Sequence, residues 1–318
     1  MRTVLSPSSD PAFNLAAEEV FLSSPAEDCG GDLLLLWASR PSVIVGKFQN
    51  PYAEVSLSAC EARGIPVVRR NSGGGTVYHD PGNLNYTVIT DRGAEFPDFG
   101  RFLSPLIRLL AERGVRAEIR DTSALFAEGK KFSGSAQSCV RIPGTGKERQ
   151  MHHGTLLFSS DLEALAALTG KSRAESEGAL RYSSRAVASS PSPVGNLAPL
   201  FEKAGSPMNF ADFRSLVARE YPRLWDADPD SSAPSGFTEE ETRKIESLAR
   251  EKYARWDWNF GRTPAFTFAS PRLSLTSKNG VILTASTDLC DPEKLVGARL
   301  EPEEIRGISE EAAETIFE

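Results

Sequence analysis

Two adjacent arginines followed by three glycines are the most distinctive chemical feature of the sequence. Arg69 and Arg70 precede the glycines Gly73–Gly75, inside a stretch from Ile65 to Ile89 that alternates short apolar runs with turn residues. Because glycine has no Cβ atom, a ligand can approach this backbone unusually closely. Guanidinium groups beside backbone amides suit a phosphate or a carboxylate. The stretch predicts an anion site, and the simpler alternative is a glycine-rich hairpin with surface arginines.

A second stretch, from Leu125 to Ala136, places lysine beside unusually small side chains. A turn at Glu128–Gly129 leads into a strand that begins with Lys130 and Lys131. The residues that follow keep the walls of a site narrow, and they are Ser133, Gly134, Ser135 and Ala136. The pattern favours a site for a slender ligand, although a single lysine in a strand is more often a solvated side chain.

Apolar periodicity and turn signals predict strands and helices. For the whole chain we expect an α+β fold with mixed, largely antiparallel sheets packed with helices, an arrangement that the family resemblance described below implies. The predicted strands include residues 33–37, 43–45, 65–68, 76–79 and 151–158, with another from Leu84. The predicted helices start after Asp10 and span 56–63, 99–113, 209–221, 238–255 and 303–317, and another follows Ser160. Residues 141–150 are predicted to form a mobile loop. The composition of residues 226–236 predicts a linker between a large domain (1–225) and a small α+β domain (237–318), and the resemblance described below implies that these are a catalytic and an accessory domain.

Composition limits the function further. The 318 residues carry 36 basic and 43 acidic side chains, and the net charge of −7 argues against broad nucleic-acid binding. Four cysteines lie far apart without a C-x-x-C pair, which argues against disulfides and zinc sites. No apolar run has the length of a signal peptide or a membrane span. We therefore expect a cytoplasmic protein that binds neither nucleic acid nor membrane.

The string R-R-N-S-G-G-G-T-V-Y-H-D-P-G-N, residues 69–83, resembles the signature of the lipoate-protein ligases, within the biotin and lipoate ligase superfamily. Three other segments resemble the same family: G-K-F-Q-N from Gly46, G-K-K-F-S-G-S-A from Gly129 and H-H-G-T-L-L from His152. Near the C-terminus, W-D-W-N-F-G-R-T-P-A-F from Trp256 resembles the accessory domain of these ligases.

The resemblance implies activation of lipoate by ATP to lipoyl-AMP, followed by transfer of the lipoyl group to a lysine of an acceptor protein. It assigns the catalytic role to Lys131, which would meet both the acyl carboxylate and the adenylate. It implies nucleotide contacts at Arg70, Gly75, Thr76, Val77, Tyr78, Asn83 and Lys131. It implies substrate contacts at Gln49, Ser72, Gly73, Gly74, His79, Ser133, Gly134, Ala136, His153 and Thr155. His79, His152 and His153 are interpreted as pocket walls and hydrogen-bond donors rather than metal ligands.

The resemblance also implies partners and cofactors. These are lipoic or octanoic acid, ATP with Mg²⁺ for which no protein ligand is assigned, and acceptors such as E2 subunits or H-type proteins of glycine cleavage. We expect a monomer that serves lipoate salvage. One departure stands at Ala124, where family members commonly carry aspartate, and Asp121 could substitute for it.

Two alternatives stay open at this point. Cys139, just beyond the G-S-A strand and beside the predicted loop, could be the nucleophile of an ATP-independent octanoyl or lipoyl transferase. The missing carboxylate at Ala124 motivates the other alternative, a lipoate-binding protein without activation chemistry.

Overall fold

The computed structural model describes residues 1–169, 181–226 and 233–317. They form two compact units, each assembled from three separate stretches of chain. The first unit comprises residues 1–40, 79–162 and 192–251, and the second comprises 41–78, 163–191 and 252–318. Both contain sheets and helices, and the sheets are mixed or antiparallel, so the predicted fold class is confirmed.

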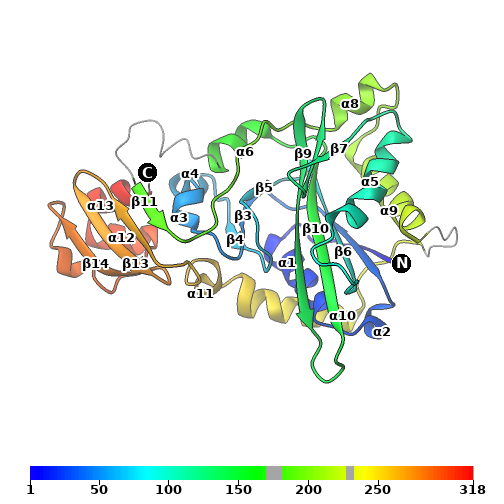
Figure 1. Cartoon of the computed structure of the whole chain (residues 1–318). Coiled ribbons are helices and arrows are strands. Elements are labelled where there is room, and N and C mark those ends of the chain that lie inside the picture. Colours follow the sequence, from blue (N-terminus) through cyan, green and yellow to red (C-terminus); the bar gives the residue numbers. More distant parts are fainter. Residues whose placement is uncertain (170–180, 227–232, 318) are drawn as a thin grey trace. The chain divides into compact units, whose positions relative to one another are not determined.

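A seven-stranded sheet organises the first unit, in the order β1-β2-β6-β10-β9-β8-β7. β1 runs parallel to β2, and the remaining neighbours are antiparallel. The long green strands of Figure 1 are β9 and β10, which form a hairpin. The strands are β1 (Arg2–Leu5), β2 (Leu33–Trp37), β6 (Asn83–Asp91), β7 (Glu118–Arg120), β8 (Ala124–Ala127), β9 (Lys130–Arg141) and β10 (Glu148–Leu157).

One face of this sheet carries the apolar core of the first unit. Leucines of β2, β6 and β10 alternate onto this face and pack against α5 (Phe99–Ala111), α8 (Ala198–Lys203) and α9 (Phe210–Asp226). In Figure 1, α5 and α9 lie side by side, as their mutual contacts require. Because successive side chains of a strand point to opposite faces, the remaining side chains of these strands lie on the second face of the sheet. That second face contacts α1 (Pro11–Leu22) through β6 and β10.

The second unit contains two smaller sheets. β3 (Ser42–Val45) lies between β4 (Val67–Arg69) and β5 (Val77–His79), and an antiparallel sheet is formed by β11 (Arg181–Ser184), β12 (Phe266–Ala269), β13 (Leu273–Lys278) and β14 (Val281–Thr287). The helices here are α3 (Pro51–Glu54), α4 (Leu57–Ala62), α6 (Leu162–Thr169), α11 (Trp256–Asn259), a 3₁₀ turn (Pro292–Lys294), α12 (Pro302–Ile308) and α13 (Glu310–Phe317). Apolar side chains from these elements share one core.

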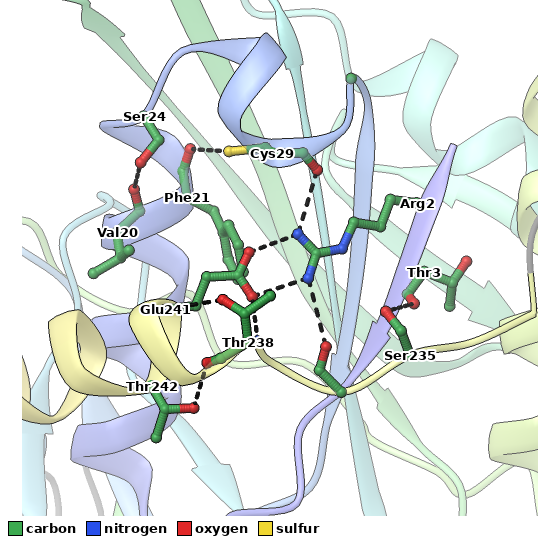
Figure 2. Close-up of polar contacts among 12 residues, drawn as sticks. Arg2, Thr3, Val20, Phe21, Ser24, Cys29, Ser235, Thr238, Glu241 and Thr242 are labelled. Atoms are coloured by element: carbon green, nitrogen blue, oxygen red, sulfur yellow. Dashed lines mark hydrogen bonds and ion pairs between the residues drawn. The ribbon is translucent and has the colours of Figure 1, made fainter.

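Hydrogen bonds join the N-terminal strand to a helix more than 230 residues away in the sequence (Figure 2). The guanidinium of Arg2 donates to both carboxylate oxygens of Glu241, at 2.6 and 2.9 Å. Glu241 and Thr238 also form the reciprocal capping box of α10 (Glu239–Leu248), which packs on α1. α2 (Ala26–Cys29) contributes the Cys29 carbonyl to Arg2 at 3.5 Å. Thus α10 belongs to the first unit, and the chain then continues through a π-helical turn (Ala249–Tyr253).

Local signals located most elements. Asp10 caps α1 by accepting from the Phe13 amide, and Pro11 is the first helical residue, as predicted. The single helix predicted over 303–317 is wrong, because Ser309 is extended and its hydroxyl caps a second helix at Ala312. The loop predicted over 141–150 is shorter and spans residues 142–147 between β9 and β10, and its mobility stays a prediction. The division into domains stays a prediction, and residues 227–232 of its linker lie outside the described residues.

Candidate active site

The glycine loop of the second unit is held by Arg70. Its guanidinium donates to the carbonyl of Gly73 at 2.6 Å, to that of Gly75 at 2.8 Å and to the hydroxyl of Ser72 at 3.1 Å. The side chain is 6% exposed. Arg70 therefore gives the loop one fixed shape and brings a positive charge to it, which is the preorganisation that an anion site needs.

A second loop packs backbone to backbone against the glycine loop. The amide of Lys47 donates to the carbonyl of Ser72 at 2.8 Å. A Cβ atom on Gly46 would lie 2.1 Å from the carbonyl oxygen of Gly74. The residue Gly74 has a φ of +88°. Only glycine fits at Gly46, because real Cβ atoms do not come so close to a carbonyl. The G-K-F-Q-N segment thus packs against one side of the glycine loop.

Gln49 and Ser189 complete this framework. The buried amide oxygen of Gln49 accepts from the Gly46 amide at 2.8 Å and from the Thr76 hydroxyl at 2.9 Å, and its nitrogen donates to Ser189 at 3.0 Å. The Ser189 hydroxyl accepts from the Thr76 amide at 3.0 Å, while the Ser189 amide donates to the buried carboxylate of Glu54. Gln49 therefore shapes the loop from inside, and its predicted contact with substrate stays a prediction.

Arg69 does not face a ligand. Its side chain is fully buried and donates to the carbonyls of Gly46, Gln49 and Asn259 at 2.9–3.1 Å. The Asn259 side chain accepts from the Arg69 amide at 2.9 Å, and the Trp258 indole donates to the Arg69 carbonyl at 2.7 Å. Burial lowers the pKa of Arg69 to about 10, so the group stays charged at neutral pH. Arg69 therefore links the W-D-W-N segment to the loop that contains Gly46 and Gln49.

In the first unit, most of the predicted residues share the second face of the large sheet. The register pairs His153 with Thr87 and Ala136, and Thr155 with Asn85. The Thr155 hydroxyl accepts from the Gly134 amide at 3.3 Å. Directly opposite residues of an antiparallel pair point to the same side. The small residues Gly134 and Ala136 of β9 thus lie next to polar side chains of β10.

Lys131 extends over this face. A Cβ atom on Gly134 would lie 3.3 Å from its ammonium nitrogen, so the absent side chain makes room for the lysine. The Lys131 backbone is fixed by bonds to Pro193 and Gly195, at 2.8 and 3.0 Å. Burial lowers the pKa of Lys131 below its ordinary value, and the charge of Asp121 partly opposes that shift. A half-buried cation beside bare backbone suits a negatively charged ligand.

His153 is oriented by a buried carboxylate from α1. Glu18 accepts from the His153 ring at 2.8 Å and from the Thr87 hydroxyl at 2.5 Å, and it is only 3% exposed. His79 lies edge-to-face with Trp37, whose ring centroid is 5.2 Å away. The first unit therefore holds two imidazoles in fixed positions, one beside a carboxylate and one beside an indole.

Residues 10–221, two thirds of the chain, match the family described as the lipoyl protein ligase A/B catalytic domain. The chain belongs to this family. It is 36% identical to the lipoate-protein ligase LplJ of Bacillus subtilis over 81% of its own length and 72% of that protein. It is 34% identical to lipoate-protein ligase 1 of Staphylococcus aureus over 81% and 73% of the two chains.

A solved structure shows the same fold. The crystal structure described as lipoate-protein ligase A bound with ATP has a TM-score of 0.64 over 81% of this chain and 97% of that one, at 23% identity. The predicted resemblance to lipoate-protein ligases is therefore confirmed as family membership.

The family's H-D-x-G-N motif has a structural role in this lipoyl protein ligase chain. The Asp80 carboxylate accepts from the amides of Gly82 and Asp161, at 2.9 and 2.7 Å. A Cβ atom on Gly82 would lie 2.2 Å from the carbonyl oxygen of Ser159. Asn83 is fully buried and donates to Asn85 at 3.0 Å. The motif thus locks a turn at the start of β6, and the predicted nucleotide contact of Asn83 stays a prediction.

Two of the predicted residues lie away from the others. Ser133 pairs with Leu125 in the register. It therefore lies on the other face of β9 from Gly134 and Ala136. His152 is not a pocket wall, because its fully buried ring stacks on Phe102 with centroids 4.8 Å apart. Burial lowers the pKa of His152 well below its ordinary value, so the ring is neutral. Of the remaining predicted residues, Tyr78 is buried in the core of the second unit.

Two residues that matter here were missed by sequence reasoning. Ser189 lies in a Ser- and Pro-rich segment whose composition indicates only a loop, and Glu18 lies among apolar residues of α1. For Glu18 a signal existed, because a carboxylate on the apolar face of a helix needs a buried partner. Ser189 carries no such signal, since its role depends on where the loop crosses the glycines.

The structure also bears on metal ions and membranes. Among residues 1–169, 181–226 and 233–317, no three His, Cys, Asp or Glu side chains are grouped as a bound metal ion would require. In the same part of the chain, no helix combines the length and apolarity needed to cross a bilayer.

Proposed function

We propose that this chain is a lipoate-protein ligase that makes lipoyl-AMP from lipoate and ATP and then lipoylates a lysine of an acceptor protein. In the first step, a carboxylate oxygen of lipoate attacks the α-phosphorus of ATP, and the bond to pyrophosphate breaks. In the second step, the neutral acceptor amine attacks the acyl carbon, AMP leaves and the amine loses a proton. The strongest support is the extent of similarity to relatives that are themselves named lipoate-protein ligases.

The residues described above suit the first step, in which negatively charged groups must come together. We assign the catalytic role to Lys131, whose fixed charge would stabilise the developing negative charge. Arg70 would serve by holding the loop Ser72–Thr76 in the shape that receives the anion. Glycines at Gly73 and Gly74 would let the ligand lie on the main chain.

ATP would bring its own metal ion. Mg²⁺ prefers few protein carboxylates and several phosphate and water oxygens. We assign no protein ligand to this ion. Magnesium would neutralise phosphate charge when bound, and the chain's own groups would position the acyl carboxylate.

We also propose the finer properties that the sequence predicts. Acceptors are lipoyl domains such as E2 subunits or H-type proteins, the acid is lipoate or octanoate, and the chain is a monomer. A cytoplasmic location is supported by four free cysteines, of which Cys29 and Cys60 are buried. The C-terminal accessory role of residues 237–318 belongs to the same proposal.

The transferase alternative is not favoured. Cys139 lies within β9, paired with Gln150, and burial together with the charge of Glu148 raises the pKa of its thiol. A nucleophilic cysteine needs the opposite shift, because the thiolate is the reactive form. Cys139→Ser should therefore leave an active protein.

Pyrophosphate exchange separates the ligase from a lipoate-binding protein. The protein is incubated with lipoate, ATP and labelled pyrophosphate, and label should appear in ATP only when lipoate is present. Octanoate in place of lipoate measures acid preference. Intact lipoate binding without exchange would contradict the ligase proposal.

The alkaline limb of this exchange should depend on Asp121. Because the folded pKa of Lys131 is lowered by burial, its cation is lost as pH rises through a value below the ordinary pKa of about 10.4. The carboxylate of Asp121 raises that pKa, so Asp121→Asn should shift the alkaline limb to lower pH. Asparagine also tolerates the φ of +50° found at Asp121. An unchanged limb would show that Asp121 does not replace the carboxylate missing at Ala124.

A further inference from the structure

An exposed apolar patch borders the glycine loop. Phe48 is 54% exposed and Val187 is 45% exposed, and the Val187 amide donates to the Phe48 carbonyl at 3.2 Å. We call these two side chains, with the cations Lys47 and Arg185, the Phe48 patch. Neighbouring apolar side chains that are exposed together are candidates for an interaction site.

The backbone ties this patch to the proposed site. The backbone amide of Lys47 donates a hydrogen bond to the Ser72 carbonyl, and a Cβ atom on Gly73 would lie 3.8 Å from the Phe48 ring. Val187 is two residues before Ser189, which accepts from the Thr76 amide. The patch therefore flanks the loop on which the activated acid would lie, within the same unit.

The charge of the patch differs from that of the whole chain. The segments 46–49 and 184–188 contain one lysine and one arginine and no acidic residue, whereas the chain carries a net charge of −7. The Lys47 ammonium lies 5.8 Å from the centre of the Phe48 ring, and Arg185 is exposed. An aromatic side chain flanked by cations complements an apolar surface edged with carboxylates.

We propose, on the basis of the ligase function above, that the Phe48 patch is the docking surface for the acceptor protein in the transfer step. The acceptor would cover Phe48 and Val187 with apolar side chains next to its target lysine. Its carboxylates would face Lys47 and Arg185. A patch of this size fits a brief encounter rather than a stable complex.

The test compares the two half-reactions in the full-length protein. The double variant Phe48→Ser/Val187→Ser should keep lipoate-dependent pyrophosphate exchange within about twofold of wild type. Its KM for an isolated lipoyl-domain acceptor, with preformed lipoyl-AMP as donor, should rise roughly tenfold or more. Arg185→Glu should also raise this KM and weaken its dependence on salt.

Matched controls are available in the same unit. Leu283 and Val296 are 51% and 48% exposed, so Leu283→Ser and Val296→Ser remove similar apolar surface elsewhere and should change neither half-reaction. A double variant with normal acceptor KM would overturn the docking proposal alone. Equal losses in exchange and transfer would overturn it as well, and would assign the patch to nucleotide or lipoate binding. Absence of exchange in the wild type would overturn the ligase function and, with it, this inference.

Discussion

Replacing Lys131 with alanine should reduce lipoate-dependent pyrophosphate exchange by about a hundredfold to a thousandfold, since removing one preorganised group at a developing anion typically costs that much. The lysine backbone is held by Pro193 and Gly195, and its side chain crosses the bare backbone of Gly134. Removing the side chain therefore removes the charge without disturbing the strand. Exchange and circular dichroism on the same preparation would measure both effects.

Lys130 provides the control for this variant. It is the adjacent residue, carries the same charge and is exposed, with its methylenes packed 2.9 Å from where a Cβ atom of Gly195 would lie. Lys130→Ala should keep normal exchange, and Lys131→Arg should keep the charge but lose most activity because the guanidinium is larger and planar. Near-normal exchange in Lys131→Ala would remove the catalytic assignment.

The sequence located the glycine loop because its cause is local, while the anion that it would bind stays a prediction. Three glycines with adjacent arginines constrain the backbone whatever lies around them, and glycine positions are restricted by sterics that sequence alone reveals. The capping residues Asp10 and Thr238 were found for the same reason. The sequence grouped Ser133 with Gly134 and Ala136, whereas strand alternation in the structure leaves only Gly134 and Ala136 together on one face.

Residue roles that depend on distant partners were not predictable. The R-R pair indicates two ligand-facing cations, yet the Arg69 side chain donates to main-chain carbonyls of Gly46, Gln49 and the distant Asn259. His152 and His153 are neighbours in one strand, so alternation must send them to opposite faces. Which face holds the core depends on α5 and α9, and only tertiary packing decides that His152 stacks on Phe102.

Gly46→Ala should destabilise the protein by about 1–3 kcal/mol and abolish exchange, because its Cβ atom would overlap the carbonyl of Gly74. Gly73→Ala should behave differently. Its Cβ atom would only reach ordinary contact with Phe48, 3.8 Å away, so stability should change by less than about 0.5 kcal/mol. Urea denaturation measures the stability of both variants, and exchange kinetics measure their activity.

The contrast between these two glycines separates a structural need from a ligand need. If lipoyl-AMP lies on the main chain of the loop, the methyl group of Gly73→Ala should raise the KM for lipoate at least roughly tenfold in a protein of normal stability. Gly307→Ala, in α12 with open space around it, should leave both stability and kinetics near wild type. A Gly73→Ala protein with wild-type kinetics would mean that the three glycines serve only the packing of the loop against Gly46, and the anion would then have to be held by side chains alone.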